Sequence, residues 1–214
     1  MKKIRMLIFL LVIAGCNTSK ITTSWKAPNT VSHQYNKLLV LAMIKDTDGN
    51  LREKMENHFV GDLKELGYDA ISSLKEYGLK AFDKMEEETA IGKLKSSGVD
   101  AVITIVLLDK KKESNYIPGR LIFSPYGYYY DHFWGYQTAL SHRIYEKGYY
   151  VTDTKYFWES NFYEMKTQQL IYSVHTQSFD PINAASMGHE YGMLIVNNMV
   201  KQQVLQQKKL LEEE

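Results

Sequence analysis

The sequence has little cysteine, little net charge and no long apolar run, and each of these absences excludes a class of protein. Its 214 residues include one cysteine, which can form neither an internal disulfide nor a cysteine-rich zinc site. A formal net charge of +1 provides no basic surface of the kind that binds nucleic acid. Apart from a short N-terminal run, no segment approaches the ~20 apolar residues of a spanning helix, which excludes an integral membrane protein. With 44% hydrophobic and 24% charged residues, the composition is that of a globular chain.

The first sixteen residues have the pattern of a secretory signal. Basic residues within positions 1–5 precede a short apolar run, which ends in small residues. The final four, Ile13-Ala14-Gly15-Cys16, resemble the lipobox of bacterial lipoproteins. The resemblance implies that residues 1–15 are removed as a signal peptide and that the sulfur of Cys16 is acylated. Each buried acyl methylene contributes about 0.8 kcal/mol, so two or three chains anchor a protein firmly without a spanning helix.

The same resemblance implies an address in the cell envelope. Asn17 stands where an aspartate favours inner-membrane retention in enteric lipoproteins, so we expect the outer membrane, on the side that faces the periplasm. The alternative is a host with a single membrane, because sorting rules differ between bacterial groups. Residues 16–36 are predicted to be the lipidated cysteine and a flexible polar tether. Residues 37–207 are predicted to form a single α/β domain, and residues 208–214 a charged tail.

Hydrophobic periodicity predicts an α/β fold in which a mixed sheet has a βαβαβ first half, an antiparallel β-hairpin and a C-terminal helix. The first half is predicted to consist of strands at 37–44, 68–71 and 99–108, a helix at 50–66 and a helical stretch at 73–97 in two pieces. Two aromatic and β-branched runs, 154–165 and 169–178, predict the hairpin. Asp180-Pro181 is predicted to open the last helix. Its apolar side is expected to contain Ile182, Ala185, His189, Met193, Val196, Val200 and Val204.

The hairpin carries a family likeness. Residues 159–173, Glu-Ser-Asn-Phe-Tyr-Glu-Met-Lys-Thr-Gln-Gln-Leu-Ile-Tyr-Ser, resemble a hairpin found in many bacterial envelope lipoproteins. These proteins are similar to the N-terminal domain of TolB and, more distantly, to the curli-secretion and penicillin-binding-protein-activator lipoproteins. The sequence differs from that pattern in lacking the glycine of the turn and in carrying a tyrosine-rich insertion. The resemblance implies an architecture and an envelope location, and no catalytic residues.

Residues 110–153 form the most unusual segment, an aromatic insertion. Twelve of the 27 aromatic residues of the chain lie between positions 116 and 150. Such a stretch is either a strand pair that extends beyond the sheet or a loop. Tyrosine and tryptophan provide large contact areas at a low entropic cost and are enriched in binding surfaces. Their alternative roles are to stack on sugars, contact a partner protein, lie at the lipid interface or pack over the exposed face of the sheet. The candidate partner-binding residues are Tyr126, Tyr128, Tyr129, Tyr130, Trp134 and Tyr136.

Candidate catalytic residues are few. Ser186 has part of the pattern of a nucleophile elbow, but its expected place is inside the last helix and not at a strand-to-helix turn. His132 and His142, with Asp131, lie in the aromatic insertion without the spacing of a metal site. His189 is expected to be a packed core residue. No phosphate-binding glycine loop occurs, and we expect no cofactor and no metal.

Three hypotheses for the function follow. The first is a non-enzymatic binding or assembly module, anchored to a membrane through Cys16, that docks a protein or glycan partner in the envelope through the tyrosine-rich segment. The second is a hydrolase or metal-dependent envelope enzyme that uses His132, His142 or Ser186. The third is a structural component that forms homo-oligomers through the edge of the hairpin.

Overall fold

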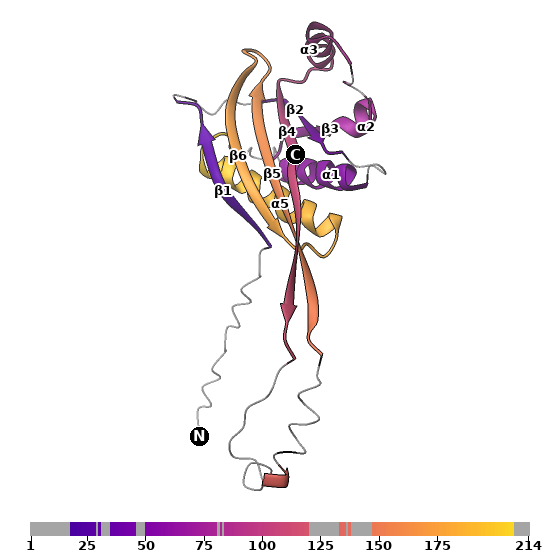
Figure 1. Ribbon diagram of the computed structural model, residues 1–214. Helices are drawn as coiled ribbons and strands as arrows, with labels where there is room; N and C mark the ends of the chain where they lie inside the picture. Colours follow the sequence, from indigo (N-terminus) through magenta and orange to yellow (C-terminus); the bar gives the residue numbers. More distant parts are fainter. Residues whose placement is uncertain are drawn as a thin grey trace, which may run out of the picture.

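A mixed sheet flanked by helices forms the body of the protein (Figure 1). The computed structural model describes residues 18–28, 30, 35–45, 50–80, 82, 84–119, 133–135, 137 and 147–207. The strands are β1 (Ser19–Lys26), β2 (Lys37–Met43), β3 (Asp69–Ser72), β4 (Ala101–Ile117), β5 (Tyr149–Glu164) and β6 (Gln169–Phe179). The helices are α1 (Asn50–Glu65), α2 (Ser73–Tyr77), α3 (Glu87–Ser96) and α5 (Ala184–Lys201). No helix among these residues is long and apolar enough to cross a membrane.

The strand order confirms the predicted fold class. The six strands lie in the order β1-β6-β5-β4-β2-β3. Strand β2 is parallel to both β3 and β4, as the βαβαβ pattern of the first half requires, and the other neighbours are antiparallel. The turn between β5 and β6 contains residues 165–168, which confirms the predicted hairpin.

Strand β2 is apolar from Leu38 to Met43 because both of its faces are covered. Its alternate residues Leu38 and Val40 join the larger hydrophobic cluster, which contains residues of α1 and α5. Leu39 points to the other face and packs in a smaller cluster with Leu94 of α3. A parallel strand covered on both faces shows a continuous apolar run in place of alternation.

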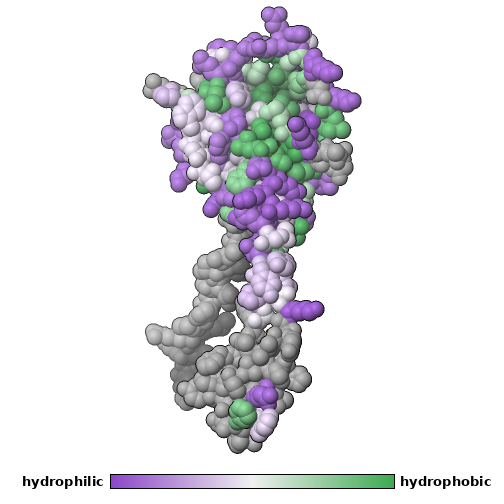
Figure 2. Space-filling model, viewed as in Figure 1, coloured by the Kyte–Doolittle hydropathy of each residue, from purple (hydrophilic) through white to green (hydrophobic). Residues whose placement is uncertain are grey.

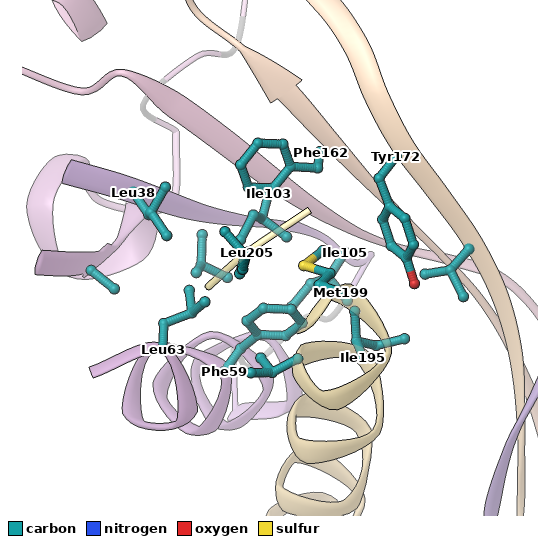
Figure 3. Packing of buried hydrophobic residues seen from close by; sticks show 14 of the residues in the cluster. Leu38, Phe59, Leu63, Ile103, Ile105, Phe162, Tyr172, Ile195, Met199 and Leu205 are labelled. Carbon is teal, nitrogen blue, oxygen red and sulfur yellow. The ribbon is translucent and has the colours of Figure 1, made fainter. Parts of the chain in front are cut away.

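The larger cluster holds α1 and α5 against one face of the sheet (Figure 3). Phe59 and Leu63 of α1 meet Ile195 and Met199 of α5 and side chains of β4, β5 and β6 there. Trp158 and Tyr191 are also fully buried. Burial of each large apolar side chain contributes about 1.5–3 kcal/mol, so this face supplies most of the hydrophobic stabilisation.

Part of the expected tether is a strand of the sheet. Residues Ser19–Lys26 form β1, which pairs antiparallel with β6 from Ser19 beside Ser178 to Lys26 beside Tyr172. The tether prediction is therefore wrong for these residues. Strand β1 also covers the outer edge of β6, so the hairpin offers no free edge for the oligomer contact that we expected there.

The start and the buried face of the last helix also differ from the prediction. Helix α5 begins at Ala184, three residues after Pro181, because Asn183 and Ser186 form a capping box: Asn183 Oδ1 accepts a hydrogen bond from the Ser186 backbone N–H at 2.9 Å. Ile182 is 89% exposed. His189 is exposed as well, and not a core residue. Met193 is 43% exposed, whereas Val196 and Val204 are buried as predicted. The buried face of the helix consists of Met187, Gly188, Tyr191, Gly192, Ile195, Val196 and Met199.

Candidate functional site

Strands β4 and β5 continue well beyond the rest of the sheet as a two-stranded arm (Figure 1). Strand β2 pairs with β4 only as far as Val106, and β6 pairs with β5 only from Lys155. Beyond these points residues 112–117 and 149–154 pair only with each other, from Lys112 beside Thr154 to Ile117 beside Tyr149. We call these two segments the arm. It corresponds to the strand-pair alternative for the ends of the aromatic insertion.

Polarity changes along the arm from charged to aromatic. At its base the carboxylate of Glu113 accepts hydrogen bonds from Lys155 at 2.5 Å and from Lys111 at 3.0 Å, and these bonds lower the pKa of Glu113. The middle holds a Ser114–Thr152 hydroxyl pair at 3.1 Å. Lysine side chains therefore cluster at the base of the arm, and a further exposed lysine, Lys147, lies two residues beyond Tyr149 at its end.

Aromatic rings occupy the end of the arm. Tyr116 and Tyr150 face each other across the strands with ring centroids 5.1 Å apart, and Tyr149 is their neighbour. The three side chains are 55%, 72% and 61% exposed. A Cβ at Gly148 would overlap the Tyr116 ring, so glycine is required there for the chain to pass close to it.

Of the predicted partner-binding residues, Trp134 is the one within the described part of the chain. It lies in the connection between the two strands of the arm, is 71% exposed and packs edge-on against Phe133, with centroids 5.2 Å apart. Tyr126, Tyr128, Tyr129, Tyr130 and Tyr136 lie outside the described residues, as do Cys16, Asp131, His132 and His142.

A shallow pocket of about 400 Å³ lies beside the base of the arm. Helices α1 and α5 both begin at this pocket, and Lys110 and Tyr156 complete its wall, with the Lys110 ammonium 4.9 Å from the centroid of the Tyr156 ring. Helix N-termini and a lysine give the pocket a positive electrostatic character.

Ser186, the candidate nucleophile of the enzyme hypothesis, belongs to the N-terminal capping box of α5, beside this pocket. Its Oγ accepts a hydrogen bond from the Asn183 backbone N–H at 3.2 Å and donates one to the Asn183 carbonyl at 3.0 Å. No histidine partner accompanies these bonds in the described residues. The serine therefore stabilises the helix start, and the arrangement does not match the activated serine of a hydrolase.

The carboxylate of Glu56 on α1 is fully buried and accepts hydrogen bonds from four groups of the protein. One oxygen accepts from the Ala42 N–H at 2.9 Å and from Arg52 Nε at 3.1 Å, and the other accepts from Ser72 Oγ and the Leu74 N–H. These bonds join α1 to the ends of β2 and β3. The carboxylate is structural, since its acceptor positions are already filled.

A second titratable group lies where α1 and α5 cross. The rings of His58 and His189 are 5.8 Å apart, and Asp62 Oδ2 is buried without a hydrogen-bond partner among the described residues. Burial, with a smaller contribution from Glu65 and an opposing one from His189, raises the pKa of Asp62 to about 6. The described residues contain no group of three side chains arranged to bind a metal ion.

The first strand is the structural feature that our sequence reasoning missed. A signal for it exists, because Ile21, Thr23 and Trp25 alternate with polar residues and β-branched residues are frequent there. Thr18, just before β1, is fixed at the arm end of the sheet: its backbone N–H and Oγ1 donate to Glu190 Oε2 at 3.0 and 2.6 Å.

No protein-family model and no curated protein matches the chain. Among solved structures, the PelC dodecamer of Paraburkholderia phytofirmans is similar with 9% sequence identity and a TM-score of 0.44, over 87% of this chain and 99% of the PelC chain. A second structure, of a single-residue variant of that dodecamer, has a TM-score of 0.43. A lipoprotein of Neisseria meningitidis has 12% identity and a TM-score of 0.42, over 78% of this chain and 99% of its own. Similarity of this size is a loose likeness in chain path and assigns no partner or activity to this chain.

Proposed function

We propose that this chain is a lipid-anchored protein of the bacterial cell envelope that acts as a non-enzymatic binding or assembly module. Its docking surface is the aromatic end of the arm, Tyr116, Ile117, Tyr149 and Tyr150, with Phe133 and Trp134 in the connection beyond it. The observation that carries the proposal is the arm itself, because it presents these rings to solvent away from the core.

The exposure of these rings supports a binding role. In the body of the fold the largest aromatic residues other than Trp25 are used for packing, and Trp158, Tyr172, Tyr191, Phe59 and Phe162 are fully buried. Exposed aromatic rings clustered at one end of a projecting element carry a cost in water that contact with a partner removes.

The anchor is the second part of the proposal. The apolar signal, the lipobox-like residues 13–16 and the single cysteine support acylation of Cys16. The location that we propose is the outer membrane, facing the periplasm. The enzymatic alternative has less support, since Ser186 serves as a helix cap.

Both parts can be tested in the native host. Mass spectrometry of the purified protein should show a chain that begins at Cys16 and carries the added mass of acyl groups. An intact initiator methionine without an acyl mass would contradict the anchor.

Photo-crosslinking tests the docking surface. A photoreactive residue in place of Tyr150 should give crosslinked products in intact envelopes, because Tyr150 is 72% exposed at the end of the arm. The matched control replaces Lys95 of α3, an exposed residue remote from the arm. Equal crosslinking at both positions, or none at Tyr150, would contradict a docking role for the arm.

A further inference from the structure

The chain enters the sheet at the end of the strands from which the arm projects. Ser19 pairs with Ser178, Ser178 with Tyr156, and Tyr156 with Lys110, so one row of residues crosses from the start of β1 to the base of the arm. Figure 1 shows β1 beginning at the level where the arm departs from the sheet. The anchor and the arm therefore belong to one side of the molecule.

Thr18 cannot move away from this end of the sheet without breaking several hydrogen bonds. Its carbonyl accepts from the Phe179 N–H at 2.8 Å, and its N–H and Oγ1 both donate to the Glu190 carboxylate. Cys16 precedes Thr18 by two residues, which span at most about 7 Å when fully extended. A lipid on Cys16 would thus hold this end of the sheet close to the membrane, with no long tether between the two.

The arm is longer than that link. Six residue steps separate Lys155, which lies beside Phe179, from Tyr149 at the end of the arm. At about 3.3 Å per residue the arm projects about 20 Å beyond the edge of the sheet. It therefore reaches about 13 Å farther than Cys16 can, while the headgroup layer of a bilayer is only about 6 Å thick.

We propose that the aromatic end of the arm inserts into the interface of the same lipid bilayer that holds the acyl chains of Cys16. This inference rests on the proposed function for the anchor, and it names a lipid surface as what the docking surface binds. The arm end and the anchor then form two attachment points, which fix the orientation of the sheet relative to the membrane.

The side chains along the arm change from charged at its base to aromatic at its end. Five lysines surround its base, namely Lys20, Lys110, Lys111, Lys112 and Lys155, and a sixth, Lys147, is exposed just beyond its end. Hydroxyl groups follow at Ser114 and Thr152, and tyrosines at the end. Figure 2 shows strongly hydrophilic residues where the arm meets the body, paler ones farther along it and one strongly hydrophilic side chain that projects near its far end. Tyrosine and tryptophan are enriched at the boundary between headgroups and acyl chains, where they are anchored by both environments.

The backbone sets the depth. The arm has two strands and thus two outer edges, whose N–H and C=O groups lack ladder partners. Unpaired backbone groups are costly in the hydrocarbon core but are satisfied in the hydrated interface. The arm end therefore lies at the headgroup–acyl boundary, with the arm inclined to the membrane normal, because an upright arm would carry its end about 13 Å deeper than Cys16 and into the hydrocarbon core.

The three tryptophans of the chain provide a direct test. Trp158 is fully buried in the core, Trp134 lies in the connection beyond the arm, and Trp25 is 46% exposed at the far end of β1, beside Ser173. The variant Trp25→Phe keeps Trp134 as its exposed tryptophan, and the matched control Trp134→Phe keeps Trp25. Both are purified as full-length acylated chains and reconstituted into phosphatidylethanolamine–phosphatidylglycerol vesicles, with and without bromine on the acyl chains.

Bromine quenches tryptophan only on close contact, so the two variants should differ. Trp25→Phe should lose about half of its emission in brominated vesicles, the share of Trp134 among its two tryptophans, while Trp134→Phe should lose almost none. An acylated, vesicle-bound Trp25→Phe chain whose emission is unchanged would overturn the insertion, leave the anchor intact and favour a protein or glycan partner for the arm. Quenching of a chain whose mass shows no acyl group would overturn the anchor and support the insertion. Equal quenching of both variants would overturn the proposed orientation.

Discussion

Glu56 shows how one buried side chain fixes several elements of this fold. Its carboxylate accepts hydrogen bonds from α1, from β2 and from the end of β3, and it is fully buried. The charged partner is Arg52, one helical turn earlier, whose guanidinium also reaches the Leu79 carbonyl and Ser73. A buried carboxylate of this kind is stable only while every one of these donors remains in place.

We predict that Glu56→Ala lowers the free energy of unfolding by about 3 kcal/mol, because it leaves Arg52 and two backbone N–H groups without their acceptor. Urea denaturation measures the loss. The matched control is Glu53→Ala, an exposed glutamate of the same helix, which should change stability by less than about 0.5 kcal/mol. A similar loss for both variants would contradict the proposed role of Glu56.

Asp62 predicts a pH dependence of stability. Its folded-state pKa of about 6 lies above the ordinary value of 3.8, so between these pH values the folded chain binds more protons than the unfolded chain. Its contribution is therefore fully present below about pH 4 and is lost as the pH rises through 6, a decrease of about 1 kcal/mol after allowance for solvent screening.

Asp62→Asn should remove this part of the pH dependence, because an amide does not ionise. The free energy of unfolding is measured at pH 4 and at pH 7, and the difference between the two values should be smaller in the variant by about 1 kcal/mol. His58 and His189, which lie at this crossing of α1 and α5, are present in both proteins. Asp69→Asn, at an exposed position of β3, should leave the difference unchanged.

At the scale of elements, the crossing of α1 and α5 depends on glycine. A Cβ at Gly192 would overlap the Asp62 carboxylate and lie 3.2 Å from Phe59 Cα, and one at Gly188 would lie 3.0 Å from the Lys54 carbonyl oxygen. The two helices thus approach through the side of α5 that carries Gly188 and Gly192. Hydrophobic periodicity gives glycine no weight, which explains why the predicted apolar side of α5 included Ile182 and His189 instead.

We predict opposite effects for two glycine-to-alanine changes. Gly192→Ala should destabilise the protein by about 1–3 kcal/mol, since the helices must move apart to accept the methyl group. Gly61→Ala in α1 should stabilise it by about 0.5–1 kcal/mol, because nothing lies within 4 Å of a Cβ there and alanine has the higher helix propensity. Thermal or urea unfolding distinguishes the two. Stabilisation by both changes would contradict the close helix contact.

At the scale of the whole molecule, β1 connects the anchor region to the body. It covers β6, and its first residues are tied to α5 through Glu190 and to β6 through the Ser19–Ser178 hydroxyl pair at 2.8 Å. Without β1 the edge of β6 would be open to pairing with another chain.

We expect a chain that begins at Ala27 to lose about 3 kcal/mol of stability, from several ladder hydrogen bonds of about 1 kcal/mol each, and to associate through β6. A chain that begins at Thr18 is the control, and it should unfold like the full-length protein. Urea denaturation gives the stability and light scattering gives the mass. An Ala27 chain as stable and as monomeric as the control would show that β1 is dispensable.

The sequence by itself determined the α/β class, the parallel core of β2, β3 and β4 and the β5–β6 hairpin, because these follow from runs of apolar residues and from short-range turn signals. The tertiary structure decided the position of β1, which depends on a partner strand about 150 residues away. It also decided where α5 starts, because Asn183 and not Asp180 caps the helix, and which face of α5 is buried, because α1 approaches it closely. The fold also decided that the chain start and the aromatic arm share one edge, since strand register across the sheet is a long-range property that no local pattern records.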